Sequence, residues 1–156
     1  MTKKTEELLK VLKDKKLTLG SAESFTAGLF ASTFCSISGA SAVFKGGIVC
    51  YDRKIKESVL GLSPELIDRY DVVSKEVAYA LAESAQKVLD VDITVSFTGN
   101  AGPTAEPGKA EVGETYMGVN VQGKINTYKT IFNGERNEIR EKAVEFVIEK
   151  LLEILK

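Results

Sequence analysis

The serine at position 24 is the side chain of this sequence best placed to act as a nucleophile. It lies in the segment from Leu17 to Gly28, where a short apolar run gives way to small residues and a helix is predicted to begin. A hydroxyl at a helix start lies in the positive end of the helix dipole, near backbone N–H groups that stabilise a developing oxyanion. The alternative is a purely structural role, because serine is a favoured helix N-cap residue.

Activation of that serine cannot use histidine, because the sequence contains none, and a Ser-His-Asp triad within the chain is therefore excluded. Serine–lysine pairs are a known alternative. Tyr51 and Lys56 follow a predicted strand, and we expect them at the same sheet edge as Ser24, where either could accept its proton. For Lys56 to act as a base, its pKa must fall from about 10.4 to roughly 7 or 8, through burial or a nearby cation such as Lys54 or Arg53. The alternative is a solvated helix start, since lysines are mostly exposed.

A second candidate ligand segment begins where a predicted strand ends at Thr98. The small residues Gly99, Ala101 and Gly102 would let backbone N–H groups approach a phosphate or a carbonyl closely. The stretch from Gly99 to Gly113 is longer than an ordinary connector, which is typical of a ligand loop or of a mobile surface loop. It lacks the Gly-Lys-Ser/Thr of a Walker A loop, and no spaced pair of acidic metal ligands accompanies it, which disfavours a phosphate-transfer enzyme.

Charged residues near these segments have several possible roles. Glu23, beside Ser24, could orient Lys56, hold a substrate amide or only pair with the helix dipole. Arg136 and Arg140, near the start of the closing helix, could bind phosphate, or could form a solvated helix face.

Composition sets the broad class of the protein. The length of 156 residues and the 44% apolar content predict one domain, residues 1–156, with helices packed on a sheet. A formal net charge of −1 argues against nucleic acid or an anionic membrane as the main partner. Cys35 and Cys50 are isolated, which disfavours a zinc site. No run of about 18 apolar residues and no signal-peptide pattern occurs, so we expect a soluble, cytoplasmic protein.

Hydrophobic periodicity predicts alternating helices and strands. The predicted helices are 1–16, 26–36, 53–60, a short one from 64, 75–89 and 133–155, and the predicted strands are 17–20, 44–51, 93–98, 115–121 and 124–132. The early β-α-β alternation favours parallel strands, and a hairpin at Gln122 and Gly123 adds an antiparallel one. We therefore predict a three-layer α/β/α sandwich on a mixed, mostly parallel sheet, with residues 21–28, 51–56 and 98–102 meeting beyond the strands' carboxyl ends.

Several segments together resemble the CinA C-terminal domain family along nearly the whole chain. They are residues 21–28, 39–44, 46–51, 73–74 and 98–103. That family includes nicotinamide-nucleotide amidases, which hydrolyse nicotinamide mononucleotide to nicotinate mononucleotide and ammonia. The resemblance implies that Ser24 is the nucleophile, Lys56 the base and Tyr51 a hydrogen-bonding partner beside them. It also implies no cofactor, no metal, a pyridine nucleotide as ligand and a homo-oligomer.

The predicted site follows from the residues and the resemblance together. Its catalytic residues are Ser24, Lys56 and Tyr51, and its substrate-binding residues are Glu23, Thr26, Gly47, Thr98, Gly99, Ala101, Gly102 and Arg140. The family motif reads AESCTGG, whereas residues 22–28 read AESFTAG, and Glu114 replaces a usual threonine. Phe25 and Ala27 could reshape the oxyanion pocket or narrow the entrance, so the alternative is a catalytically impaired nucleotide-binding module.

Overall fold

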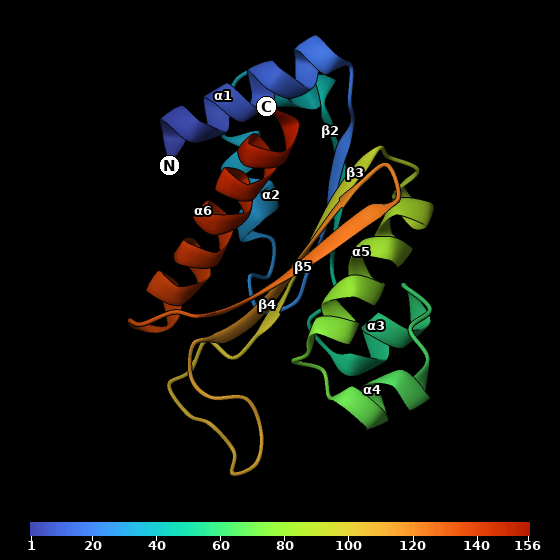
Figure 1. Ribbon diagram of the computed structural model, residues 1–156, viewed down its shortest axis with the longest axis vertical. Coiled ribbons are helices and arrows are strands. Elements are labelled where there is room, and N and C mark those ends of the chain that lie inside the picture. The colour runs from blue at the N-terminus through green and yellow to red at the C-terminus, as the bar shows by residue number, and fades with distance from the viewer.

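The centre of the protein is a five-stranded sheet with the strand order β2-β1-β3-β4-β5 (Figure 1). The computed structural model describes all 156 residues. The strands are β1 (Leu19–Glu23), β2 (Phe44–Val49), β3 (Ile93–Gly99), β4 (Glu114–Val121) and β5 (Lys124–Ile131). β1 pairs in parallel with β2 and β3, whereas β4 runs antiparallel to β3 and β5. The carboxyl ends of β1, β2 and β3 therefore lie at one edge, as the sequence predicts.

Helices cover both faces of this sheet, which confirms the predicted three-layer sandwich (Figure 1). They are α1 (Thr2–Lys15), α2 (Leu29–Cys35), α3 (Arg53–Ser58), α4 (Pro64–Tyr70), α5 (Lys75–Leu89) and α6 (Arg136–Leu155), with a short 3-10 helix at Ala40–Ala42. α1, α2 and α6 lie on one face, and α3, α4 and α5 lie on the other. None of these helices combines the length and the apolar composition that crossing a bilayer requires.

Local sequence signals account for several element boundaries. The hydroxyls of Ser63 and Ser74 accept hydrogen bonds from the first turns of α4 and α5, and Pro64 occupies the first position of α4. Gln122 and Gly123 both adopt positive φ, at 52° and 93°, as a two-residue type I′ hairpin requires. These starts and this turn agree with the predicted ones.

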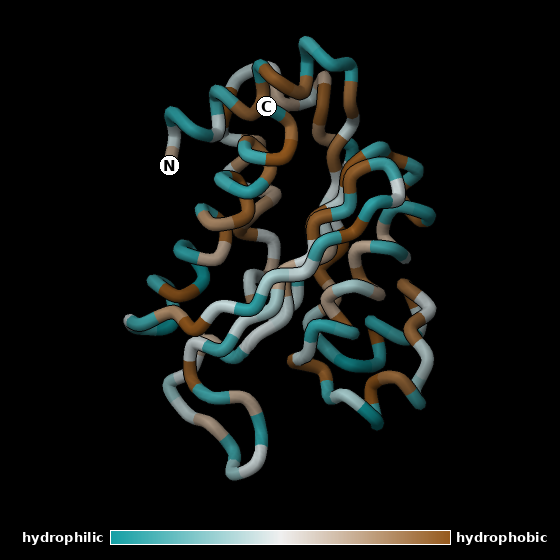
Figure 2. Tube along the Cα trace, in the orientation of Figure 1, coloured by the Kyte–Doolittle hydropathy of each residue, from teal (hydrophilic) through white to brown (hydrophobic).

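The two faces of the sheet are packed by different means. The larger apolar core lies between the sheet and α1, α2 and α6, whereas a smaller one lies under α5. On the α5 side, the hydroxyls of Thr94, Ser96 and Thr98 donate to backbone carbonyls across the layer at 2.6 Å each. A Cβ on Gly118 would lie 2.8 Å from the Ala78 carbonyl oxygen, so α5 rests almost directly on the strands. Figure 2 shows by contrast that the loop between β3 and β4 is mostly hydrophilic or neutral.

The region around Ser24 differs from the prediction of a strand at 17–20 and a helix at 26–36. β1 continues to Glu23, because its buried residues pair with strands on both sides. Ala27 and Gly28 have φ of 48° and 94°, a left-handed backbone that is incompatible with a helix, so α2 begins only at Leu29. Ser24 therefore lies in a turn between β1 and α2 and does not cap the helix.

Candidate active site

Ser24 and Lys56 are in direct contact. The Lys56 Nζ donates to the Ser24 Oγ at 2.8 Å, to the Cys50 carbonyl at 2.7 Å and to the Tyr51 carbonyl at 3.2 Å. Both side chains are buried, with only 1% of Lys56 and 8% of Ser24 exposed. In its neutral form the amine keeps two N–H donors for the two carbonyls and accepts a hydrogen bond from the Ser24 hydroxyl instead. That is the direction of proton sharing that general-base activation requires.

The sheet edge and a short helix create this contact. Ser24 follows the last residue of β1, and its backbone N–H donates to the Phe97 carbonyl of β3 at 2.9 Å. Lys56 belongs to α3, which starts two residues after Tyr51 and is capped by the Asp52 carboxylate. The pairing of β1 with β2 and β3 thus brings together two residues that are 32 positions apart in the chain.

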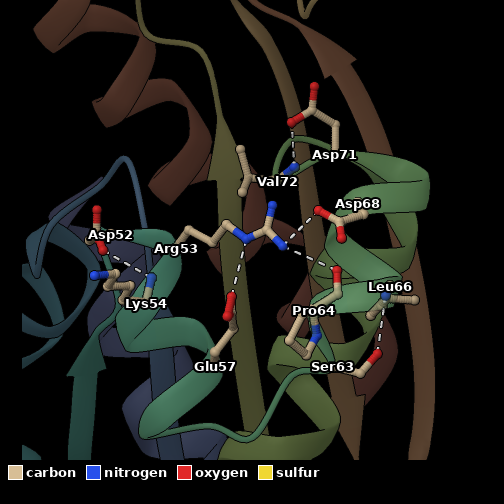
Figure 3. Close-up of polar contacts among 10 residues, drawn as sticks. All are labelled: Asp52, Arg53, Lys54, Glu57, Ser63, Pro64, Leu66, Asp68, Asp71 and Val72. Atoms are coloured by element: carbon tan, nitrogen blue, oxygen red, sulfur yellow. Dashed lines mark hydrogen bonds and ion pairs between the residues drawn. The ribbon is translucent and has the colours of Figure 1, made fainter.

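Burial lowers the pKa of Lys56 from its ordinary 10.5. The three groups that accept its hydrogen bonds are uncharged, and no carboxylate lies within ion-pair distance of its amine. The sequence also suggests a nearby cation, Lys54 or Arg53, as a possible cause of a lowered Lys56 pKa. Neither cation is among the causes of the shift. Arg53 is bound by Glu57 and Asp68 instead (Figure 3).

The pair lines a cavity of about 340 Å³, a size that suits a small-molecule ligand. Its other lining residues are Phe25, Tyr51, Asp52, Arg53, Val72, Val73, Thr98, Gly99, Asn100, Ala101 and Arg136. A second cavity of about 460 Å³ adjoins it and shares Val72, Val73, Gly99 and Asn100. An ion pair of 2.9 Å between Lys109 and Asp71 joins the β3–β4 loop to the opposite wall of this second cavity.

The backbone amides at the catalytic cavity that have no partner in the chain include those of Phe25 and Ala101. Phe25 and Ala101 both line the cavity, and their N–H groups donate no hydrogen bond to any protein group. Free N–H groups beside a nucleophile are the components of an oxyanion hole. The Phe25 ring itself is 5% exposed and belongs to the larger core. Gly99 leaves it room, because a Cβ there would lie 3.1 Å from the ring.

Tyr51 is placed differently from its implied role beside the pair. Its side chain is 57% exposed at the rim, and its hydroxyl accepts from the Arg136 Nη2 at 3.0 Å. Only its backbone carbonyl contacts Lys56. Gly102 lies at the same rim, where its carbonyl accepts a hydrogen bond from Arg136.

Of the predicted substrate-binding residues, Thr98, Gly99 and Ala101 line the cavity. The Thr98 hydroxyl donates to the Val72 carbonyl at 2.6 Å. No group of three or more His, Cys, Asp or Glu side chains converges anywhere in the structure.

Glu23 and Gly47 lie away from the cavity. The Glu23 carboxylate is 1% exposed and accepts from the backbone N–H groups of Phe30 and Ala31, at 2.8 and 3.1 Å. Of the roles left open for Glu23, the structure supports pairing with the helix start. Gly47 faces Ser21 in the ladder, where a Cβ would lie 2.7 Å from the Ser21 hydroxyl.

Arg140 and Thr26 lie behind the turn that carries Ser24 and do not line the cavity. Arg140 donates to the Phe25 carbonyl at 3.0 Å and to the Thr26 carbonyl at 2.7 Å. The Thr26 hydroxyl is fully buried and has no hydrogen-bond partner. Arg140 therefore holds the carbonyls of the turn on one side. Sequence reasoning missed this contact, because no local pattern reports on partners more than 100 residues away.

Comparisons with known proteins agree on one family. The model of the CinA C-terminal domain matches residues 1–155. A competence-damage inducible protein of Bacillus subtilis is 41% identical over 154 residues, which is 99% of this chain and 37% of that protein. A CinA-like protein of Leptospira borgpetersenii is 39% identical over 152 residues, 97% of this chain and 36% of the relative. The chain thus spans little more than a third of these relatives.

Solved structures of similar proteins have the same fold. The competence or damage-inducible protein of Enterobacter asburiae superposes with a TM-score of 0.97 at 28% identity, covering 99% of this chain and 98% of that one. A competence/damage inducible protein of Agrobacterium tumefaciens superposes with a TM-score of 0.95 at 26% identity, covering 99% and 95%.

Proposed function

The chain belongs to the CinA C-terminal domain family, and on that premise we propose that it is an amidohydrolase that converts nicotinamide mononucleotide to nicotinate mononucleotide and ammonia. One observation carries the proposal: the buried Lys56 amine lies 2.8 Å from the Ser24 hydroxyl in a ligand-sized cavity. The substrate comes from the resemblance of the sequence motifs to the family's amidases. The names of the relatives mention competence and damage but no reaction.

In the first half-reaction, neutral Lys56 takes the Ser24 proton and the serine oxygen attacks the carboxamide carbon. The N–H groups of Phe25 and Ala101 hold the oxyanion of the tetrahedral intermediate. The Lys56 ammonium then gives its proton to the amide nitrogen, the C–N bond breaks, and ammonia leaves an ester on Ser24.

In the second half-reaction, Lys56 removes a proton from water, and the resulting hydroxide attacks the ester carbon. The intermediate collapses, the Ser24 oxygen leaves and recovers the proton from Lys56, and nicotinate mononucleotide is released. One titrating group thus serves both steps, alternately as base and as acid.

Ammonia release from nicotinamide mononucleotide tests the proposal directly. We expect activity in the wild type and its loss in Ser24→Ala and Lys56→Met, because each removes one member of the pair. Lys54→Met is the matched control, since it removes an exposed lysine of the same short helix and should retain activity. Circular dichroism shows whether each variant is folded. Undiminished ammonia release by folded Ser24→Ala would refute the mechanism.

The alternative, an impaired nucleotide-binding module, rests on the substitutions after the nucleophile. The left-handed backbone of Ala27, with φ of 48°, is a conformation that glycine adopts at lower cost. Both Ala27 and Phe25 are nevertheless accommodated without separating Ser24 from Lys56. Calorimetric binding of the mononucleotide by a folded wild type that yields no product would favour this alternative.

A further inference from the structure

The catalytic cavity has a single carboxylate in its lining, that of Asp52. No step of the proposed reaction uses this side chain. Asp52 is exposed and directly precedes α3, so its carboxylate lies on a cavity wall that a ligand can reach. Charged groups that line a ligand-sized cavity fix which ligands bind and how they are oriented.

This carboxylate has no cationic partner within the protein. It forms no salt bridge with any lysine or arginine. Its one hydrogen bond comes from the Lys54 backbone N–H, which donates to Asp52 Oδ2 at 2.9 Å (Figure 3). The cavity therefore contains a negative charge that no protein group of opposite sign neutralises.

The two arginines that line the same cavity are engaged elsewhere. The Arg53 side chain points away from Asp52, toward Asp68, with which it forms an ion pair of 2.8 Å (Figure 3). Arg136 donates to uncharged oxygens, among them the Tyr51 hydroxyl at 3.0 Å. A positively charged group of a ligand would therefore meet Asp52 without displacing an existing ion pair.

The charge of Asp52 also reaches the reacting groups. The Lys56 backbone N–H donates to the Asp52 carbonyl at 3.2 Å, so both residues belong to the first turn of one short helix. Burial lowers the pKa of Lys56, and the negative charge of Asp52 partly opposes that shift. The field of Asp52 therefore extends to the Ser24–Lys56 pair, where a reacting amide would lie.

The proposed substrate carries a matching cation. In nicotinamide mononucleotide the ring nitrogen is bonded to the sugar, which makes the ring a positively charged pyridinium. The carboxamide is attached to this ring, so a ligand whose amide carbon meets Ser24 brings the ring charge into the field of Asp52. A cation there would also offset the negative charge that opposes the neutral form of Lys56.

We propose that Asp52 is a specificity-determining residue, whose carboxylate makes the site prefer an amide on a cationic pyridinium ring over the same amide on an uncharged ring. This inference rests on the proposed amidase function and defines the class of ring that the site accepts. Because Asp52 is exposed, water and salt weaken its attraction for a cation, so we expect it to contribute a preference of roughly 3- to 10-fold.

The kinetic test compares nicotinamide mononucleotide with the benzamide C-nucleotide, in which carbon replaces the ring nitrogen and the ring is uncharged. Asp52→Asn removes the charge and keeps a favoured N-cap residue before α3. We expect the ratio of kcat/KM values, mononucleotide over C-nucleotide, to fall roughly 3- to 10-fold in this variant. The two amides differ in reactivity equally in both proteins, so that difference cancels from the comparison.

Asp90→Asn is the matched control for this measurement. It removes the same charge from an exposed C-cap residue of α5 that does not line the cavity, and asparagine tolerates the left-handed backbone there. The control should keep the wild-type ratio. Circular dichroism shows whether each variant is folded, and an unchanged ratio in folded Asp52→Asn would overturn the proposal.

A binding test separates this proposal from the amidase proposal. Titration calorimetry with both nucleotides uses Ser24→Ala, with and without Asp52→Asn, so that turnover plays no part. We expect Asp52→Asn to weaken binding of the mononucleotide roughly 3- to 10-fold, to leave binding of the C-nucleotide unchanged, and the difference to shrink as salt is added. An equal effect on both nucleotides would overturn the role of Asp52 even if the wild type releases ammonia. A selective loss in a protein without amidase activity would sustain that role and reject the proposed reaction.

Discussion

At the scale of single residues, the chemistry depends on the burial that lowers the pKa of Lys56. The oxygens around its amine are uncharged and no carboxylate forms an ion pair with it, so burial disfavours the ammonium form without a compensating ion pair. A carboxylate beside the amine would stabilise the charge and remove the base. Glu23, the buried carboxylate nearest in sequence to Ser24, is instead occupied by Ser21 and the start of α2.

This environment predicts a dependence of activity on pH. The folded-state pKa of Lys56 lies below 10.5, and only the neutral amine accepts the Ser24 proton. We therefore expect kcat/KM to rise with pH and to level off above that lowered pKa. Cys50, whose thiol pKa burial raises to about 11, stays neutral through this rise and cannot produce it. A pH–rate profile measured with wild type and with Cys50→Ala checks this, and a rate that falls as pH increases toward 10.5 would contradict it.

Arg140 is expected to act on the rate through the turn that follows Ser24. Its bonds to the carbonyls of Phe25 and Thr26 fix the orientation of that peptide segment, which carries the free Phe25 N–H group. We predict that Arg140→Met lowers kcat by up to about 100- to 1000-fold, the range for the loss of an oxyanion donor, with little change in KM. Steady-state kinetics measures both constants, with Lys142→Met of the same helix as control. A raised KM at unchanged kcat would instead support the substrate-binding role predicted from sequence.

At the scale of elements, the loop between β3 and β4 is tied at its base by Asn100. The Asn100 side chain donates to the carbonyls of Thr104 and Ala110 and accepts from the Gly102 N–H at 2.8 Å. Its backbone also pairs with Gly113 and Glu114, on the far side of the loop. The long glycine-containing segment is thus held in one shape against both cavities.

Removing this tie should loosen the loop without unfolding the sheet. We predict that Asn100→Ala raises KM several-fold and increases proteolytic cleavage within residues 101–112, because the two carbonyls lose their donor. Limited proteolysis and substrate titration measure these effects. Asn126→Ala, an exposed asparagine of β5, is the control. Cleavage rates and KM equal to those of the wild type would show that the loop does not depend on Asn100.

At the scale of the whole molecule, most of the apolar core lies away from the catalytic cavity. α1 packs against α6, and the two chain ends lie near each other at the side opposite the β3–β4 loop (Figure 1). The cavity lies at the other end, where Arg136 begins α6. The first residue of α6 therefore lines the cavity, whereas the buried residues farther along α6 contribute to the core that stabilises the fold.

Leu12→Ala tests this separation. Leu12 is fully buried in the larger core, and its truncation should lower the free energy of unfolding by about 2–5 kcal/mol. We expect kcat/KM of the folded protein to stay within about twofold of wild type, because no residue of α1 lines the cavity. Urea unfolding and kinetics at low temperature measure the two quantities. A large loss of kcat in folded protein would show that the layers are coupled.

Features that depend on neighbouring residues were predictable from the sequence. The serine caps at positions 63 and 74, the hairpin at Gln122 and Gly123 and the apolar stripe of α5 all use contacts between residues a few positions apart. The candidate pair of Ser24 and Lys56 also followed from residue types, from the absence of histidine and from the family motif.

Tertiary structure alone decided how those residues are used. β1 extends to Glu23 because it forms ladders with β2 and β3. Ser24 therefore lies in a turn and not at the helix start that the sequence predicts. Burial of Lys56 and the attachment of Arg140 to the Phe25 carbonyl, 115 residues away, depend on packing between distant segments. A sequence pattern reports the preferences of nearby residues, whereas solvation and long-range hydrogen bonds exist only once the layers have assembled.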